Sequence, residues 1–145
     1  MKQITHEKLT KRILLLSKKH KLSHIGSCVS VLPILMEIYE QKKPEDKVIM
    51  DNAHAHLAHL VVQEAYNDLE GIEKLLTDHG IHCDTKAGCD ASGGSLGHGI
   101  GIAIGMALAD KKRKIYVTMS DGGMAEGSNW EALRILKESG LKNVL

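Results

Sequence analysis

Residues 114–123 read Lys-Ile-Tyr-Val-Thr-Met-Ser-Asp-Gly-Gly, and this run gives the clearest structural signal in the chain. Its first part, up to Met119, is rich in β-branched and apolar side chains and predicts a buried strand. The strand ends abruptly at Ser120, where a carboxylate and two glycines follow. Ligands of open parallel sheets bind beyond the carboxyl ends of the strands, so Asp121 and Gly122 are candidate ligand contacts. The same Asp-Gly-Gly sequence is also ordinary turn chemistry, and this alternative stays open.

On both sides of this run, segments with a strand pattern alternate with segments with a helix pattern. Residues 47–50 predict an earlier strand that stops at the polar residues 51–54, and residues 142–145 predict the start of a later one. Apolar residues at helical spacing predict helices from Ser30 onward and over 5–20, 56–69, 71–78, 100–110 and 126–139. Residues 80–99 form a long loop rich in glycine and serine, of the kind that is usually functional or disordered. Because strands alternate with helices, the sequence predicts an α/β fold with a parallel sheet covered by helices.

Three of the predicted helices carry packing expectations. Thr5 is the expected cap of the first, whose apolar face holds Leu9, Ile13 and Leu16. Ser30 is the expected cap of the second, with Pro33 in its first turn. The residues of this second helix expected to face inward are Ile34, Leu35, Ile38 and Tyr39. The small residues of the helix over 100–110, expected to allow tight packing on the sheet, are Gly101, Ala103, Gly105 and Ala107.

Composition excludes several classes of partner. The chain has 145 residues, 43% of them hydrophobic, so we expect one core and a single domain over residues 1–145. Basic and acidic residues nearly cancel, at 19 against 18, and a formal net charge of +1 gives no electrostatic reason to expect nucleic acid or a membrane surface as partner. No apolar run approaches a membrane span, and the N-terminus lacks the apolar core of a signal peptide. We therefore expect a cytoplasmic protein.

The cysteines have two interpretations. Cys28, Cys83 and Cys89 are odd in number and irregularly spaced, which predicts free thiols in a reducing compartment, with Cys28 in the core. Alternatively, His79 and His82 could join Cys83 and Cys89 in a zinc site, although the spacing fits no usual zinc finger.

Several segments resemble, in order, the motifs of one family. Residues 120–132 (Ser-Asp-Gly-Gly-Met-Ala-Glu-Gly-Ser-Asn-Trp-Glu-Ala) are similar to the opening of the thiamine-diphosphate motif of transketolases. Residues 93–99 (Gly-Gly-Ser-Leu-Gly-His-Gly) resemble the loop that lies against the cofactor's aminopyrimidine. Residues 23–26 resemble that family's Ser-Gly-His-Pro-Gly loop, residues 51–55 its Ser-Asn-Gly-His-Gly loop, and His82 a further pocket histidine. Over nearly its whole length, the chain resembles the N-terminal thiamine-diphosphate-binding domain of transketolases.

The resemblance implies a set of cofactor contacts. Asp121 would bind the Mg²⁺ that bridges the diphosphate, with Gly122 close to the phosphates. Gly94 and Leu96 would line the pyrimidine and thiazolium rings, and His54 would also contact the cofactor. The implied cofactors are therefore thiamine diphosphate and Mg²⁺.

The resemblance also implies catalytic histidines. His24, His54 and His82 would hydrogen-bond the substrate and relay protons around the reacting centre. By contrast, His56 and His59 lie on or near one helix start, and we expect them to be surface residues, since histidines are often solvated.

The implied activity is transfer of a two-carbon ketol unit between sugar phosphates. In this family the site lies at a subunit interface, so Glu126 would face a partner, either a second copy or a chain that carries the pyrimidine domain. The second metal-binding Asn and the activating glutamate of the pyrimidine domain would lie beyond Leu145. We therefore expect residues 1–145 to be an incomplete domain that is inactive without further chain or a partner subunit.

Some positions depart from the family pattern. Ser120 replaces a glycine, Ile25 replaces a proline, and Ala53 and Ala55 replace the glycines around the second histidine, which predicts a narrower pocket.

Two other functions stay open. One is a related enzyme with the same cofactor and another acceptor, such as a deoxyxylulose-phosphate synthase or a decarboxylase-type enzyme. The other is a non-catalytic remnant or interaction subunit that retains the loops.

Overall fold

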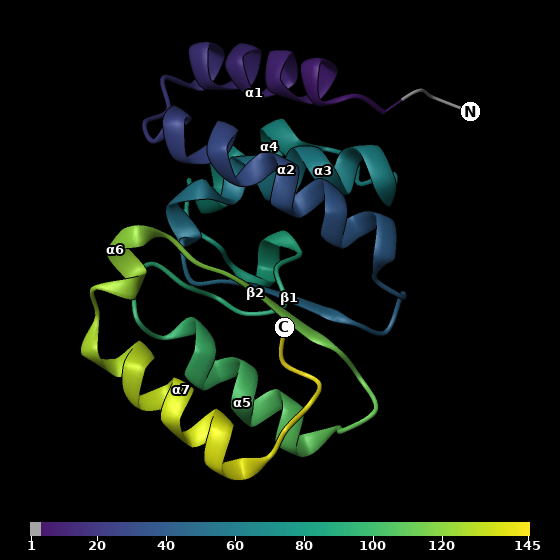
Figure 1. Ribbon diagram of the computed structural model, residues 1–145. Coiled ribbons are helices and arrows are strands. Elements are labelled where there is room, and N and C mark those ends of the chain that lie inside the picture. The colour runs from purple at the N-terminus through teal and green to yellow at the C-terminus, as the bar shows by residue number, and fades with distance from the viewer. Residues whose placement is uncertain (1–3) are drawn as a thin grey trace. The chain divides into compact units, whose positions relative to one another are not determined.

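The computed structural model describes residues 4–145, and its contacts divide the chain into two compact units (Figure 1). The helical unit comprises residues up to 41 together with His54–His82. The sheet unit comprises Lys42–Ala53 and Cys83–Leu145. The fold is α/β, as the alternating pattern predicted.

Among its described residues, the helical unit contains four α-helices, α1 (His6–His20), α2 (Ile25–Gln41), α3 (His56–Tyr66) and α4 (Ile72–His79). The helix α3 packs against the other three, and α1 also packs against α2. The predicted cap of α1 is confirmed, because the hydroxyl of Thr5 accepts a hydrogen bond from the backbone N–H of Lys8 at 3.3 Å. Over residues 4–145 no helix combines the length and the apolar character needed to cross a bilayer.

The second helix begins earlier than predicted. It starts at Ile25, after His24 at φ +60°, so Pro33 lies inside the helix rather than in its first turn. The predicted cap, Ser30, is a helical residue whose hydroxyl donates to the carbonyl of Ser27 at 3.1 Å. The prediction of the buried face is confirmed only in part. Leu35 is buried as predicted, whereas Ile34 is 51% exposed.

The surface prediction for two histidines is wrong. His56 and His59 are 0% and 1% exposed. Both belong to a continuous buried run at the start of α3, which is the helix with contacts to all the others of its unit. The hydroxyl of Tyr39 lies 2.8 Å from Nε2 of His59, so the buried ring has a polar partner on α2.

The sheet unit is built on two parallel strands, β1 (Lys47–Met50) and β2 (Ile115–Thr118), paired from Lys47↔Ile115 to Met50↔Thr118. Near the predicted start of a later strand, Val144 forms a single isolated parallel bridge with Ile115 of β2. The helices of this unit are α5 (Gly99–Ala109), α6 (Asp121–Met124) and α7 (Gly127–Ser139), and it has a short 3-10 turn at Thr85–Ala87 (η2). Another 3-10 turn, η1 (Ala53–Ala55), starts at the last residue of the segment 42–53 and continues into the helical unit. In Figure 1, α5 and α7 run side by side next to the strands.

The helix α5 packs on the sheet through its alanines. Ala103 and Ala107 form a buried cluster with Ile49 of β1 and Ile115 of β2. The two glycines predicted to allow close packing do not do so. A Cβ on Gly101 or Gly105 would meet no heavy atom within 4 Å, because both residues lie on the exposed side of the helix.

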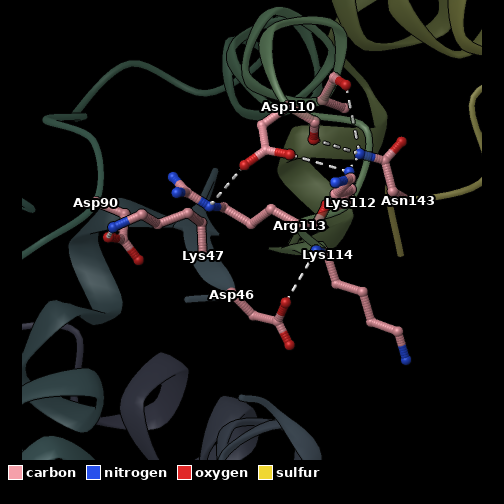
Figure 2. A network of polar contacts seen from close by, with 9 residues as sticks. Asp46, Lys47, Asp90, Asp110, Lys112, Arg113, Lys114 and Asn143 are labelled. Atoms are coloured by element: carbon pink, nitrogen blue, oxygen red, sulfur yellow. Dashed lines mark hydrogen bonds and ion pairs between the residues drawn. The ribbon is translucent and has the colours of Figure 1, made fainter. Parts of the chain in front are cut away.

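Polar contacts hold the starts of the strands together (Figure 2). The carboxylate of Asp46 accepts hydrogen bonds from the backbone N–H groups of Lys43 and Lys114, both at 2.9 Å. Burial acts to raise the pKa of Asp46, but these hydrogen bonds together with the charges of Lys114 and Lys42 hold the pKa below its ordinary value. Asp90 accepts from Lys47 Nζ at 2.7 Å and from the N–H of Val48 at 2.8 Å. With their starts fixed in this way, both strands end at one edge of the sheet.

Candidate functional site

The residues predicted to bind the metal and the phosphates follow β2 directly. Ser120 caps a short helix, α6, by accepting a hydrogen bond from the N–H of Gly123 at 3.1 Å. Asp121 is the first residue of α6, and its exposed side chain makes no hydrogen bond or ion pair with the part of the chain that the structure describes. Gly122, half-buried, is next to it. The sequence suggested only a turn here, since Asp-Gly-Gly is poor helix-forming sequence.

The loop over 93–99 lies against α6. Leu96 is half-buried, and its Cδ1 is 3.1 Å from the position that a Cβ of Gly122 would occupy. Leu96 and Gly122 belong to distant segments of the sequence, and both were predicted to contact the same cofactor. The structure brings these two residues close together. Gly94 is exposed in the same loop. Gly97 has φ +90°, and a Cβ there would lie 2.5 Å from the hydroxyl of Ser128, so this position requires glycine.

A buried carboxylate that the sequence left without a role connects these segments. Asp51 follows β1 and accepts hydrogen bonds from the N–H groups of Gly97 at 2.9 Å and Gly99 at 2.7 Å. Its other oxygen accepts from Nδ2 of Asn129 at 3.2 Å, and this same nitrogen donates to the carbonyl of Gly123 at 2.8 Å. The position of Asp51 at a strand end was visible in the sequence, but its partners lie 46–78 residues away and no local pattern indicates them.

The helical unit brings its predicted histidines together. The ring centroids of His24 and His54 are 4.9 Å apart. Burial, with smaller contributions from the nearby charges of His24 and His82, holds the pKa of His54 below its ordinary value. His24 and His82 are exposed and His54 is half-buried, so all three rings are reachable from solvent in this unit.

Cys28, Cys83 and Cys89 form no disulfide, and all three are buried. In the sheet unit, the sulfur atoms of Cys83 and Cys89 lie within 4.8 Å of each other. A hydrogen bond between the thiols and, secondarily, burial raise the pKa of Cys83 far above its ordinary value. In the helical unit, burial raises the pKa of Cys28, whose place in the core was predicted. A raised pKa favours the protonated, poorly nucleophilic form of the Cys28 and Cys83 thiols.

The chain is thus an α/β domain with glycine-rich loops at the carboxyl edge of a parallel sheet, the edge at which such domains commonly bind ligands. The family model described as 1-deoxy-D-xylulose-5-phosphate synthase matches residues 1–145. The chain belongs to this family, as the thiamine-diphosphate-binding N-terminal domain that transketolases share.

Curated relatives agree with this membership. The chain is 31% identical to an apulose-4-phosphate transketolase subunit of Phocaeicola vulgatus, over 99% of this chain and 58% of that protein. It is 32% identical to transketolase-like protein 2 of Mus musculus, over 84% of this chain and 23% of that protein. It is 25% identical to 1-deoxy-D-xylulose-5-phosphate synthase of Lachnoclostridium phytofermentans, over 92% of this chain and 23% of that protein. The chain thus spans between 23% and 58% of the length of these relatives.

Proposed function

We propose that the chain binds thiamine diphosphate and Mg²⁺ as part of a transketolase-like enzyme that transfers a two-carbon ketol unit between sugar phosphates. The observation that carries the proposal is the close approach of Leu96 to Gly122, where a Cβ would lie 3.1 Å from Leu96 Cδ1, next to the unpaired carboxylate of Asp121. Membership in a family of thiamine-diphosphate-dependent proteins supports it.

The residues after β2 fit a magnesium diphosphate group. The exposed carboxylate of Asp121 is a hard oxygen ligand, and Mg²⁺ typically takes one or two protein carboxylates and completes its shell with phosphate oxygens and water. Gly122 carries no side chain that could block approach to the backbone, and a Cβ there would press on Leu96. Under the proposal, Asp121 binds the metal, Gly122 lies near the diphosphate, and Gly94 and Leu96 contact the rings.

The histidines have proposed roles in proton transfer. When bound, thiamine diphosphate supplies an electron sink for the two-carbon unit. The lowered pKa of His54 favours its neutral ring at neutral pH, so one of its ring nitrogens can accept a proton. The proposal assigns His54 to cofactor and substrate, and His24 and His82 to the substrate hydroxyls and carbonyl.

The proposal includes a partner. One relative is named as one subunit of a transketolase, which supports a form in which another chain completes the enzyme. A second copy of this chain is the other candidate, and in either case Glu126, exposed at the junction of α6 and α7, is proposed to face the partner. We propose that residues 1–145 act as one cofactor-binding domain that needs further chain or a partner for activity, with sugar phosphates as substrates and the cytoplasm as location.

A second candidate is the reaction named in the family description, 1-deoxy-D-xylulose-5-phosphate synthesis. The two candidates share the cofactor and differ in the substrates. Assays of the completed enzyme distinguish them: transfer from a ketose phosphate without gas release supports ketol transfer, and release of carbon dioxide from a 2-oxo acid donor supports a decarboxylating reaction.

The test is titration calorimetry of the folded chain with thiamine diphosphate in the presence and absence of Mg²⁺. We expect Mg²⁺-dependent binding that Asp121→Ala weakens by about tenfold or more, since a lost interaction with a charged group is worth about 1.5–3 kcal/mol. Glu131→Ala, which removes an exposed carboxylate from α7, is the matched control and is expected to bind like the wild type. Absence of binding by the folded wild type, or full binding by Asp121→Ala, contradicts the proposal and favours a non-catalytic remnant.

A further inference from the structure

Asp51 makes an unusual set of contacts for a buried acid. It is 2% exposed, and within residues 4–145 no cation pairs with it. Its oxygens instead accept hydrogen bonds from the backbone N–H groups of Gly97 and Gly99 and from the side chain of Asn129. Gly99 is the first residue of α5, where the positive end of the helix dipole favours an anion. Burying a carboxylate costs free energy unless hydrogen bonds replace those that it made to water. The N–H donors around Asp51 must therefore be held closely in place.

The contacts of Asp51 reach both segments to which the proposed function assigns the cofactor. Through Gly97 and Gly99 the carboxylate fixes the backbone on the C-terminal side of Leu96. Through Asn129 it is joined to the carbonyl of Gly123, the residue after Gly122. The fit at Gly123 is close, because a Cβ there would lie 2.5 Å from Oδ2 of Asp51.

We propose that Asp51 is a positioning residue for the bound cofactor, which holds the loop of Leu96 and the helix α6 at the separation that the cofactor requires. This inference rests on the proposed function. Asp51 itself touches neither metal nor diphosphate in the proposal and acts through the backbone of Gly97 and Gly123. Replacement by Asn keeps the size of the side chain but exchanges one acceptor oxygen for an NH₂ group. That group would face an N–H donor, either from the glycines or from Asn129.

The chain offers a matched control for a purely structural role. Asp46 is a second buried carboxylate of the sheet unit, 4% exposed, and also accepts hydrogen bonds from backbone N–H groups. It precedes β1, whereas Asp51 follows it, so it lies at the opposite edge of the sheet from the proposed cofactor segments. Asp46→Asn therefore makes the same chemical change, with a similar loss of backbone hydrogen bonds, away from the site.

The chain also has an internal reporter. Trp130 is the only tryptophan and is 58% exposed on α7. Its indole N–H donates to the carbonyl of Met124, the last residue of α6, at 2.7 Å. Trp130 fluorescence is therefore expected to respond to ordering of α6, without any measurement of activity.

The experiment is a fluorescence titration with thiamine diphosphate at saturating Mg²⁺, at a temperature where unfolding curves show every variant folded. We expect Asp51→Asn to weaken binding by about ten- to a hundredfold, and Asp46→Asn to leave it within about twofold. Hydrogen exchange of the cofactor-free chain is a second readout, in which the amides of Gly97 and Gly99 exchange faster in Asp51→Asn than in Asp46→Asn. If Asp51→Asn does not fold, Asn129→Ala removes the hydrogen bonds from Nδ2 to Asp51 and to the carbonyl of Gly123 but keeps those from Gly97 and Gly99 to Asp51. It is expected to weaken binding by a smaller factor.

The outcomes separate this inference from the proposed function. Wild-type affinity in Asp51→Asn or Asn129→Ala, together with loss of binding in Asp121→Ala, overturns the role of Asp51 and leaves the cofactor site standing. Equal loss of affinity in Asp51→Asn and Asp46→Asn also overturns it, since that result indicates general destabilisation. Absence of binding by the wild type overturns both.

Discussion

Among single residues, Gly123 leaves no space for a side chain. A Cβ at this position would lie 2.5 Å from Oδ2 of Asp51, within the buried hydrogen-bond network. We expect Gly123→Ala to lower the free energy of unfolding by about 1–3 kcal/mol, the usual cost of overpacking. Urea unfolding measures this. Gly127→Ala is the control, because a Cβ there meets no heavy atom within 4 Å, and we expect it to be neutral or stabilising by up to about 1 kcal/mol. A neutral Gly123→Ala would contradict the close packing around Asp51.

His54 gives the helical unit a pH dependence. Because its folded-state pKa lies below the ordinary value of 6.5, the unfolded chain binds its proton at higher pH than the folded chain does. The stability associated with the neutral ring is therefore present above about pH 6.5 and is lost as pH falls from there through the lower folded-state pKa. We expect the midpoint of thermal unfolding to fall less between pH 7 and pH 5 in His54→Gln than in the wild type. Parallel curves for the two proteins would show that His54 does not contribute.

Some residues of the candidate site could be predicted from local sequence motifs, and others could not. Asp121, Gly122 and Leu96 stand in short runs with recognisable chemistry, so the sequence could single them out. The partners of Asp51 depend on contacts between distant segments, and the burial of His56 depends on which helices surround α3. Neither kind of contact leaves a local pattern.

At the scale of elements, α5 carries a glycine that contributes no packing. Gly105 is exposed in the middle of the helix, with space for a Cβ. We expect Gly105→Ala to raise the free energy of unfolding by about 0.5–1 kcal/mol, because alanine loses less backbone entropy in a helix. Chemical unfolding of both proteins measures the difference. Gly140→Ala is the contrasting variant: Gly140 closes α7 at φ +64°, and alanine there is expected to destabilise by about 1 kcal/mol.

Element prediction succeeded where local signals agree. For α1, a capping residue and an apolar face at helical spacing point to the same helix, and the two strands are short apolar runs ended by polar residues. It failed at the start of α2, where Ser30 has the chemistry of a cap but serves as a helical residue. It also missed α6, since a helix with two glycines forms only because Ser120 and the surrounding contacts hold it.

At the scale of the molecule, the grouping of the segments could not be predicted from local patterns. Residues 42–53 lie between helical segments in the sequence yet join the sheet unit, because β1 pairs with β2 and Asp46 bonds Lys114, 68 positions away. Alternating strands and helices do predict the parallel pairing. The alternating patterns do not predict which segments make the most contacts with one another, and so they do not predict which unit each segment joins.

Because all three thiols are buried, the rate of thiol labelling can report the opening of each unit separately. Cys28 belongs to the helical unit and Cys83 and Cys89 to the sheet unit, and a thiol reagent can reach them only when the surrounding structure opens. We expect native-state labelling to be more than about a hundredfold slower than labelling of an unfolded cysteine. Mass spectrometry of peptides after timed labelling measures both units in one sample, and rapid labelling of any of the three would contradict its burial. The dependence of each rate on urea then reports whether the two units open in one cooperative event or independently.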